Sequence, residues 1–342
     1  MPFTVRQFLL DRAVLIADGH ALEALPYWFP KATPGLLRRR LVADPGQARD
    51  AILLAQAPEG LAGLRALPGL VQSAAQAGAA GLVIVSSTPS GEYFGHGQGE
   101  ACATPTLLVG SKDLSALQAA VASGQPIDME IAGEVRNDAE GFNVVARVGT
   151  AGPVVGVSTP TSAWTTSAGE RGPGVALWLM LLRRAAARPG RWTFVASSGH
   201  ELRAAGGRAF AESGAGPKPE DTALWVHLGA SIATRRFERD ALGRFSPTDQ
   251  PGRGARLLTN QTAWLAPLTT AFGERTPFTP VLATAATARG ELQLYFGEGY
   301  RAVGFEGSHD FFHAPGDLPN VTSPALLEAV GLSLIQFIDG VV

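Results

Sequence analysis

Strand-like and helix-like hydrophobic patterns alternate along the first half of the chain. Residues 51–57 (AILLAQA) form a short apolar run, and a second such run begins at residue 81 (GLVIVSS). Between them, the alanine-rich residues 70–80 suit a helix. A third apolar run from residue 104 (TPTLLVG) precedes a helix expected from about Ser111 to Ala122. Strands separated by helices predict a small α/β module with a core over about residues 36–134.

The segments on either side of this module differ from it. The first 35 residues are expected to form short strands and turns, because prolines break any helix there: Pro26, Pro30 and Pro34. On the other side, polarity rises over residues 136–143 (RNDAEGFN), which indicates a domain boundary. We therefore expect an N-terminal part, residues 1–137, that contains the module, and a second domain over residues 138–342.

The second domain repeats the alternation with longer elements. Strands are expected at residues 142–148, 153–158, 192–198 and 223–229. Helices are expected at residues 174–187, from Glu201 to about Glu212, and after the Ser323-Pro324 pair that suits a helix start. This order predicts a mostly parallel sheet flanked by helices on both faces.

Composition narrows the class of protein. Apolar residues make up 46% and charged residues 17% of the chain, which is typical of a globular protein and not of a disordered one. The formal net charge is -2 and no long basic run occurs, so nothing indicates a nucleic-acid partner. The single cysteine, Cys102, excludes an intrachain disulfide and a cysteine-rich zinc site.

Two further observations concern location. The longest apolar run, residues 175–182, is far too short to cross a bilayer, and no membrane partner is expected. Arg6, Asp11 and Arg12 interrupt the first apolar stretch, which is unlike a secretory signal. We therefore expect a cytoplasmic protein, although the sequence does not indicate its oligomeric state.

Candidate chemistry lies just after the predicted strands, where ligands bind in open α/β sheets. Four such places carry polar residues: Ser158-Thr159 with the loop WTTSAGERG, the pair His200-Glu201, His227, and the late segment SHDFFHAPGD. Imidazole and carboxylate groups are ligands that zinc accepts. The predicted metal ligands are Glu170, Glu201, His227 and His313.

Each candidate also has a purely structural interpretation. His227 lies in an apolar strand and is equally typical of a buried histidine bonded to the backbone. Glu201 begins a helix, where a carboxylate favours the positive end of the dipole. Glu170 beside Arg171 suits an ordinary ion pair, and His313 before a proline suits a surface loop. Their shared position after strands is what favours a common site.

The second domain resembles the co-catalytic zinc aminopeptidases, a peptidase family M28-like group that includes the glutaminyl cyclases. The likeness spans residues 142–342 and lies in the order of its segments: NVVARV, PVVGVS, GPGVALWLMLLRRAAA, WTFVASSGHELRAAGGRAFAES, ALWVHLG and FFHAPGDLPNVTSPALLEAVGLSLIQFI. The preceding segments GAAGLVIVSS and TPTLLVGSKDLSALQAAVASGQPIDMEI resemble a protease-associated domain. The resemblance implies a zinc-exopeptidase-like fold with this smaller domain inserted.

The family's metal ligands carry over only in part. The late ligand histidine corresponds to His313 and the ligand of the family's glutamate pair to Glu201, both intact. The bridging aspartate corresponds to Glu170, and a further ligand aspartate to His227. The first ligand histidine and the aspartate two residues later correspond to Thr159 and Thr161, so their functions are lost.

The resemblance thus implies one zinc ion in place of two, as in the glutaminyl cyclases. The family's general base corresponds to His200, which either accepts a proton in its place or holds the position structurally. Arg171 is a candidate anchor for a substrate carboxylate, and the loop hydroxyls are candidates for substrate binding or for capping a helix: Thr165, Thr166 and Ser167.

Three functions follow from these residues. The first is a single-zinc hydrolase or acyl-transfer enzyme that acts on a peptide-like or amide substrate. The second is a catalytically inactive peptidase homologue that serves as a binding protein. The third is metal-free chemistry in the same cleft, through His200 with Glu201 or a loop hydroxyl.

Overall fold

The computed structural model describes residues 1–58, 60–97 and 101–342 of the chain. The chain divides into two compact units. The larger unit contains residues 1–5, 140–312 and 317–342, and the smaller contains residues 6–139 and 313–316. The division near the middle falls after Ala139, where the sequence predicts it after residue 137. The short segment His313–Gly316, with one predicted ligand, is part of the smaller unit.

The larger unit is built on a seven-stranded sheet in the order β16-β15-β17-β12-β10-β11-β9. Its strands are β9 (Val144–Val148), β10 (Val154–Pro160), β11 (Arg191–Ser197), β12 (Thr222–His227), β15 (Arg256–Thr259), β16 (Pro280–Leu282) and β17 (Ala302–Glu306). The four neighbours β17, β12, β10 and β11 run parallel, and β9 closes one edge antiparallel to β11. The mostly parallel sheet predicted from the sequence is confirmed.

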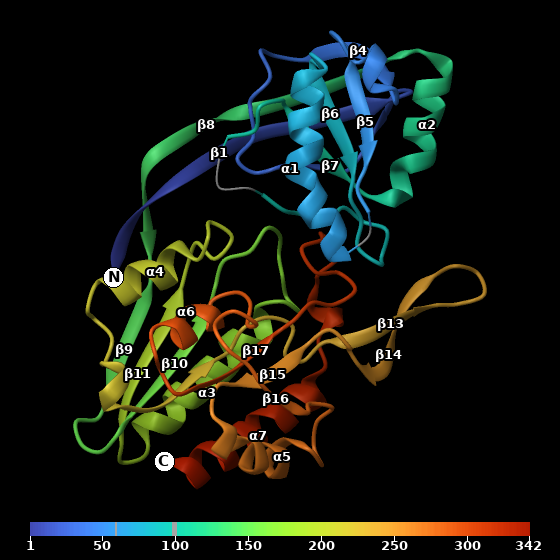
Figure 1. The fold of residues 1–342 in the computed structure, drawn as a ribbon. Coiled ribbons are helices and arrows are strands. Elements are labelled where there is room, and N and C mark those ends of the chain that lie inside the picture. The colour runs from blue at the N-terminus through green and yellow to red at the C-terminus, as the bar shows by residue number, and fades with distance from the viewer. Residues whose placement is uncertain (59, 98–100) are drawn as a thin grey trace. The chain divides into compact units, whose positions relative to one another are not determined.

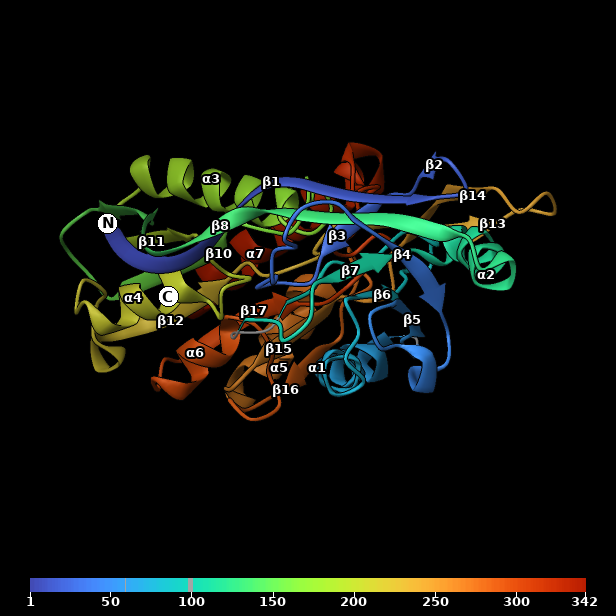
Figure 2. The ribbon, with the colours of Figure 1, turned by 90° about the horizontal axis from the view of Figure 1, so that it is seen from above.

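Helices cover both faces of this sheet (Figures 1 and 2). Side chains from α3 (Gly172–Ala186), α5 (Leu265–Phe272) and α7 (Pro324–Val341) share one hydrophobic core with Leu224 and Val226 of β12. Side chains from α4 (Ala205–Glu212) and α6 (Leu292–Gly297) share the opposite core with Trp225. Successive side chains of a strand point to opposite faces, so one apolar strand serves two cores.

The core on the α4 and α6 side is built around Trp225. Its ring stacks on Tyr295 with 4.4 Å between centroids. A Cβ atom at Gly156 of the neighbouring strand β10 would lie 2.1 Å from the indole ring, so only glycine leaves room there. A glycine usually weakens a strand, but at this position it allows the strand to pack closely against the indole.

Helix α7 is the helix in the described part of the chain that is long and apolar enough to cross a membrane, judged by length and composition alone. Its buried side chains include Val330, Leu334 and Phe337, which belong to the core of the larger unit. This packing is that of a core helix in a globular domain.

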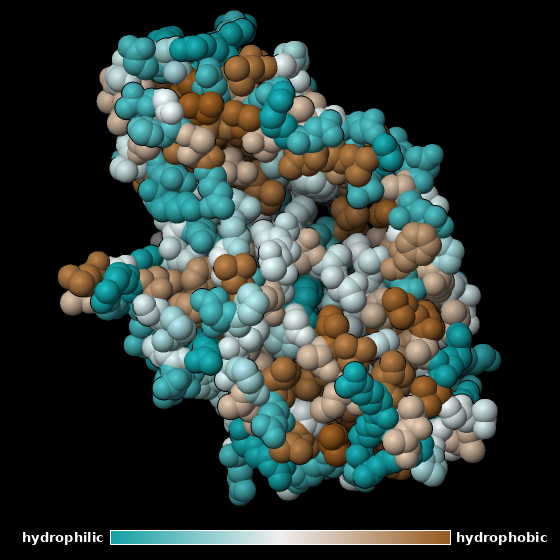
Figure 3. All heavy atoms as spheres, turned by 180° about the vertical axis from the view of Figure 1, so that it is seen from behind, coloured by the Kyte–Doolittle hydropathy of each residue, from teal (hydrophilic) through white to brown (hydrophobic). Residues whose placement is uncertain are grey.

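A hairpin of β13 (Arg235–Arg239) and β14 (Phe245–Pro251) projects from the larger unit, and its tip is hydrophobic on the surface (Figure 3). Leu242 in the turn is 78% exposed. At the base of the hairpin, Phe237, Phe245 and Phe311 pack against one another. The sequence patterns did not predict this hairpin.

The smaller unit contains an eight-stranded sheet in the order β2-β1-β8-β4-β5-β6-β7-β3. Its strands are β1 (Pro2–Ala17), β2 (His20–Ala21), β3 (Ala24–Pro26), β4 (Leu37–Val42), β5 (Ile52–Gln56), β6 (Gly81–Val85), β7 (Thr106–Val109) and β8 (Pro126–Phe142). Strands β4 to β7 run parallel and carry α1 (Gly60–Gln76) and α2 (Leu114–Ser123). Short 3-10 turns in the whole chain lie at Pro45–Gln47, Ser111–Asp113, Pro219–Asp221, Thr262–Trp264 and Pro319–Val321.

Two sequence expectations for this region were wrong, those for the first residues and for the end of the first helix. The first residues form one long strand, β1, because they are a neighbour of β8 in the sheet, a distant partner that local patterns do not reveal. The predicted boundary segment does contain the division between the units, after Ala139, and it lies within the continuous strand β8. Helix α1 ends at Gln76 and not at residue 80, because Ala79 and Ala80 already lead into β6.

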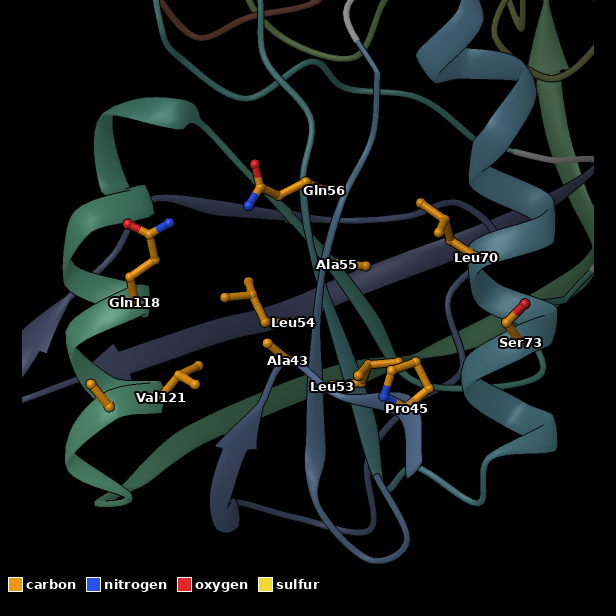
Figure 4. Close-up of a pocket in the computed structure, with 11 residues that line it drawn as sticks. Ala43, Pro45, Leu53, Leu54, Ala55, Gln56, Leu70, Ser73, Gln118 and Val121 are labelled. Atoms are coloured by element: carbon orange, nitrogen blue, oxygen red, sulfur yellow. The ribbon is translucent and has the colours of Figure 1, made fainter. Parts of the chain in front are cut away.

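A pocket of about 450 Å³ opens in the smaller unit between α1 and α2 (Figure 4). Strand β4 pairs with β5 only through Leu41 and Val42, so Leu54, Ala55 and Gln56 continue past the end of β4. These three residues line the pocket, with Leu70 of α1 and Gln118 of α2 on either side.

Candidate functional site

The predicted site residues follow the carboxyl ends of three neighbouring parallel strands. In the register of the sheet, Pro160 at the end of β10 is paired with Ser197 at the end of β11. On the other side of β10, Ser158 is paired with His227 at the end of β12. The loops that carry Glu170 and Glu201 therefore start from the same edge of the sheet.

Arg171 links the two predicted glutamate ligands. Its Nη2 atom lies 2.6 Å from Oε1 of Glu170 and donates a hydrogen bond of 2.8 Å to Oε1 of Glu201. The side chains of Glu170 and Arg171 are 0% and 7% exposed. The guanidinium Nε also donates to the carbonyl of Ser162 at 2.9 Å. The ion pair of Glu170 and Arg171, which the sequence left as an alternative, is present.

These contacts bear on the predicted role of Arg171 as a substrate anchor. The carboxylates that its guanidinium binds belong to the chain itself. No contact of Arg171 in the described part of the chain points to a substrate carboxylate, so that role stays a prediction.

The buried carboxylate of Asp317 fixes the loop that carries Glu170. Its two oxygens accept hydrogen bonds from the backbone N–H groups of Gly169 at 2.6 Å and Glu170 at 3.0 Å. Nε2 of His309 lies 3.2 Å from the same carboxylate, and both side chains are almost fully buried. Because two backbone donors are held by one carboxylate, the position of Glu170 is determined by the backbone as well as by its own side chain.

Thr159 and Thr161 correspond by the resemblance to the family's first ligand histidine and to the aspartate two residues later, and both threonines are bonded to the backbone. Thr159 Oγ1 donates to the carbonyl of Leu228 at 2.9 Å, and Thr161 Oγ1 donates to the carbonyl of Ser197 at 2.9 Å. A hydroxyl bonded in this way completes a local hydrogen-bond network. Neither threonine offers the imidazole or carboxylate ligand that a second zinc ion requires.

The loop that carries Thr165, Thr166 and Ser167 buries some of its hydroxyl groups and exposes others. Thr165 and Ser167 lie with their hydroxyl oxygens 3.3 Å apart, and Ser167 is buried with a backbone φ of 51°. Thr166 is exposed. The backbone carbonyl of Ser167 accepts from the N–H of Arg171 at 2.9 Å, so the loop leads directly into α3. Its predicted role in substrate binding stays a prediction.

His200 is held by a buried glutamate that the sequence patterns did not single out. Nδ1 of His200 lies 3.0 Å from Oε1 of Glu291, and Oε2 of Glu291 accepts from the hydroxyl of Ser197 at 2.6 Å. The backbone N–H of His200 donates to Oγ of Ser162 at 2.9 Å. A carboxylate only accepts, so Nδ1 carries the proton and Nε2 is the acceptor nitrogen of the ring.

The charge of Glu291 depends on these partners. Burial by itself raises the pKa of this carboxyl, because the charged form loses its hydration. The hydrogen bond and electrostatic interaction with His200, with smaller contributions from His227 and Ser197, bring the pKa below its ordinary value. Glu291 is therefore an ionised carboxylate at neutral pH, and it follows Gly290 at a turn before α6, where the helix pattern alone gave no signal.

His227 makes a different set of contacts from the two glutamate ligands. Its Nδ1 lies 2.8 Å from Oγ of Ser158, and the same Oγ accepts a hydrogen bond from the indole N–H of Trp225 at 2.9 Å. Burial lowers the pKa of His227 to about 4, and the charges acting on it are those of Glu291, His200 and Arg171. The ring is thus neutral at pH 7, and its contacts do not support a role as a metal ligand, which stays a prediction.

His313 is described with the smaller unit. Its ring stacks on Phe94 with 5.2 Å between centroids, and Nδ1 lies 2.8 Å from the carbonyl oxygen of Gly95. An N–H donated to a backbone carbonyl fixes the tautomer, which leaves Nε2 as the ring nitrogen able to bind a metal. The backbone φ of His313 is 61°, a conformation that a non-glycine residue rarely adopts.

The predicted donor set is chemically suited to zinc. Glu170, Glu201 and His313 offer two carboxylates and one imidazole, which are ligands that a zinc ion accepts. The place between the two carboxylates is taken by the guanidinium of Arg171. A metal ion therefore reaches Glu170 and Glu201 on the condition that Arg171 moves away.

Comparison with known proteins identifies the fold. No family model and no curated protein matches the sequence. Among solved structures, a peptidase M28 precursor from Shewanella amazonensis is 17% identical, with a TM-score of 0.73 over 99% of this chain and 82% of that chain. A zinc aminopeptidase from Bacillus subtilis is 13% identical, with a TM-score of 0.69 over 99% and 84%.

A further solved structure agrees with these two. An aminopeptidase from an Aneurinibacillus strain is 16% identical, with a TM-score of 0.61 over 99% of this chain and 83% of that chain. At identities this low the likeness shows the fold alone. This chain has the fold of the zinc aminopeptidases, and the predicted M28-like, zinc-exopeptidase-like fold is confirmed.

Proposed function

We propose that the protein is a hydrolase or acyl-transfer enzyme that acts on a peptide-like or amide substrate. His200 accepts the proton of the attacking group, and Glu170, Glu201 and His313 hold one zinc ion. The observation that carries the proposal is the pair of His200 and the buried carboxylate of Glu291, 3.0 Å apart. By the sequence resemblance His200 takes the position of the family's general base, and Glu291 gives it the carboxylate partner that suits a proton acceptor.

The chemistry of the pair supports this role. Glu291 accepts the Nδ1 proton of His200, which orients the ring and stabilises it when Nε2 takes up a second proton. The hydroxyl of Ser197 donates to Glu291, and Oγ of Ser162 accepts a hydrogen bond from the backbone N–H of His200. Because Nδ1 already donates to Glu291, the ring keeps its orientation when Nε2 takes up a proton. The proton is returned from Nε2 to the leaving group in the second half of the reaction.

A zinc ion, when bound, supplies polarisation of the substrate carbonyl or of a water molecule. The residues of this chain supply the rest. Glu201 follows His200 directly in the sequence, so a metal ligand and a proton acceptor are adjacent. His313 enters the ligand set on the strength of the sequence resemblance, and its Nε2 has the tautomer that metal binding requires.

The proposal is tested by turnover of a panel of aminoacyl and N-acyl amides, with metal content measured on the same samples. Replacing His200 by Ala is expected to lower turnover by ~100-fold or more while zinc remains bound. A parent protein that binds zinc and loses no activity in His200→Ala contradicts the role of His200. A parent protein that is inert on the whole panel and binds no zinc contradicts the enzyme proposal.

A second candidate function is favoured by the threonines. Thr159 and Thr161 replace two residues that the family's chemistry requires, and both are committed to backbone carbonyls. On this proposal the protein is an inactive peptidase homologue that binds a peptide. Binding of amides to a metal-free parent without turnover is the result that distinguishes it from the enzyme.

A further inference from the structure

Arg171 places a positive charge where a carboxylate-lined metal site places its ion. A single nitrogen, Nη2, lies 2.6 Å from Oε1 of Glu170 and 2.8 Å from Oε1 of Glu201. We infer that Arg171 is a built-in competitor of the metal ion: it neutralises the two glutamates when no ion is bound, and a divalent ion reaches them only by displacing it. The inference rests on the proposed zinc site but not on the proposed reaction.

The burial of the three groups makes this competition strong. Glu170 is 0% exposed and Glu201 is 13% exposed, and carboxylates in such surroundings require a positive partner. The guanidinium brings one positive charge to two carboxylates, whereas a divalent ion brings two. An ion added beside the guanidinium places two positive groups within a few ångströms of each other in a region of low dielectric constant. The ion and the guanidinium therefore exclude each other.

The guanidinium is held in place by more than its two carboxylates. Its Nε donates to the carbonyl of Ser162 at 2.9 Å, and the backbone N–H of Arg171 donates to the carbonyl of Ser167 at 2.9 Å. Displacement by an ion thus breaks the bond to Ser162 as well as both ion pairs. The affinity of the site for zinc is lowered by the free energy of these contacts.

The test is titration of zinc chloride into the whole chain after treatment with a chelator, followed by calorimetry. Arg171→Gln removes the charge and keeps much of the side-chain length, and it is expected to bind zinc at least about tenfold more tightly than the parent. Arg171→Lys keeps the charge but loses the bond to Ser162, so its affinity is expected to lie between the two. Arg184→Gln removes an arginine of α3 that pairs with Asp339 of α7, and this variant is expected to match the parent.

Thermal unfolding gives a second measurement that does not depend on activity. With chelator present, Arg171→Gln is expected to unfold at a lower temperature than the parent, because two buried carboxylates have lost their contact with the guanidinium. Zinc is then expected to raise the unfolding temperature of Arg171→Gln by more than that of the parent. Where Arg171→Gln does not fold, the comparison of Arg171→Lys with the parent takes its place.

Equal zinc affinities in the parent and in the folded Arg171 variants overturn the inference, as do equal shifts of unfolding temperature with zinc. The result of this test does not depend on whether the proposed reaction takes place. Tighter binding by Arg171→Gln supports the inference even where neither protein turns over an amide. An active parent whose zinc affinity is unchanged in Arg171→Gln contradicts the inference and leaves the reaction in place.

Discussion

The ring of His200 is bound through Nδ1 to the carboxylate of Glu291, a residue 91 positions away in the sequence. This contact gives the ring one orientation and one tautomer, and it leaves Nε2 as the nitrogen that accepts a proton. Glu291 itself is fully buried and is held by Ser197. Glu291 is thus a positioning residue for the proposed proton acceptor.

Replacing Glu291 by Gln tests this relationship. The amide keeps the size of the side chain but no longer stabilises a protonated His200. We expect turnover on amide substrates to fall by roughly 10–100-fold, as it does when outer partners of a site are lost. The measurement is kcat and KM on the panel of amides, and the decrease is expected in kcat. Unchanged kcat in a folded Glu291→Gln protein contradicts the positioning role.

A pH dependence of stability is expected from His227. Its pKa is about 4 in the folded protein against an ordinary value of 6.5, because burial disfavours the charged ring. The unfolded chain therefore binds more protons between these values. Stability from this group is fully present above pH 6.5 and is lost as the pH falls toward 4, by up to about 1.4 kcal/mol per pH unit.

The control for this dependence is His227→Asn, which removes the titrating group and keeps an acceptor for the Ser158 hydroxyl. The variant is expected to be less stable at pH 7 but to lose less stability on acidification than the parent. Free energies of unfolding from urea denaturation at pH 7, 6 and 5 measure both effects. Parallel pH curves for the two proteins contradict the assignment to His227.

Removal of His313 tests the zinc ligand set. His313→Ala is expected to weaken zinc binding by more than the roughly 10–100-fold that loss of an outer partner costs. His309→Ala is the matched control, because Nε2 of His309 is 3.2 Å from Asp317 and the ring is already engaged there. This control is expected to lower the unfolding temperature and to weaken zinc binding less than His313→Ala does, because it acts on Glu170 only through Asp317. Equal zinc affinities in His313→Ala and the parent exclude His313 as a ligand.

Packing of the sheet is tested at Gly156. An added methyl group at this position meets the indole of Trp225 at 2.1 Å, which the packed core cannot accommodate without moving the ring. Gly156→Ala is expected to lower the free energy of unfolding by about 1–3 kcal/mol. Gly340→Ala in α7 is the control, because nothing lies within 4 Å of the added atom. Its stability is expected to stay the same or to rise by up to about 1 kcal/mol.

The order of strands and helices in the larger unit was predictable from the sequence, because the periods of a strand and of a helix are local properties of the chain. The same holds for the edge of the sheet at which the loops with Glu170 and Glu201 begin, since parallel strands bring their carboxyl ends together. Both features depend on residues close together in the sequence. Strand β1 was missed because its length depends on its place beside β8, which lies more than a hundred residues later.

The chemistry of the site was decided by tertiary structure. The sequence places His200 and Glu201 side by side, but it does not determine that a buried Glu291 from the start of α6 binds the histidine. It places Arg171 next to Glu170, but not with one nitrogen between Glu170 and Glu201. These contacts depend on the direction of individual side chains, which packing against distant segments determines and local periodicity does not.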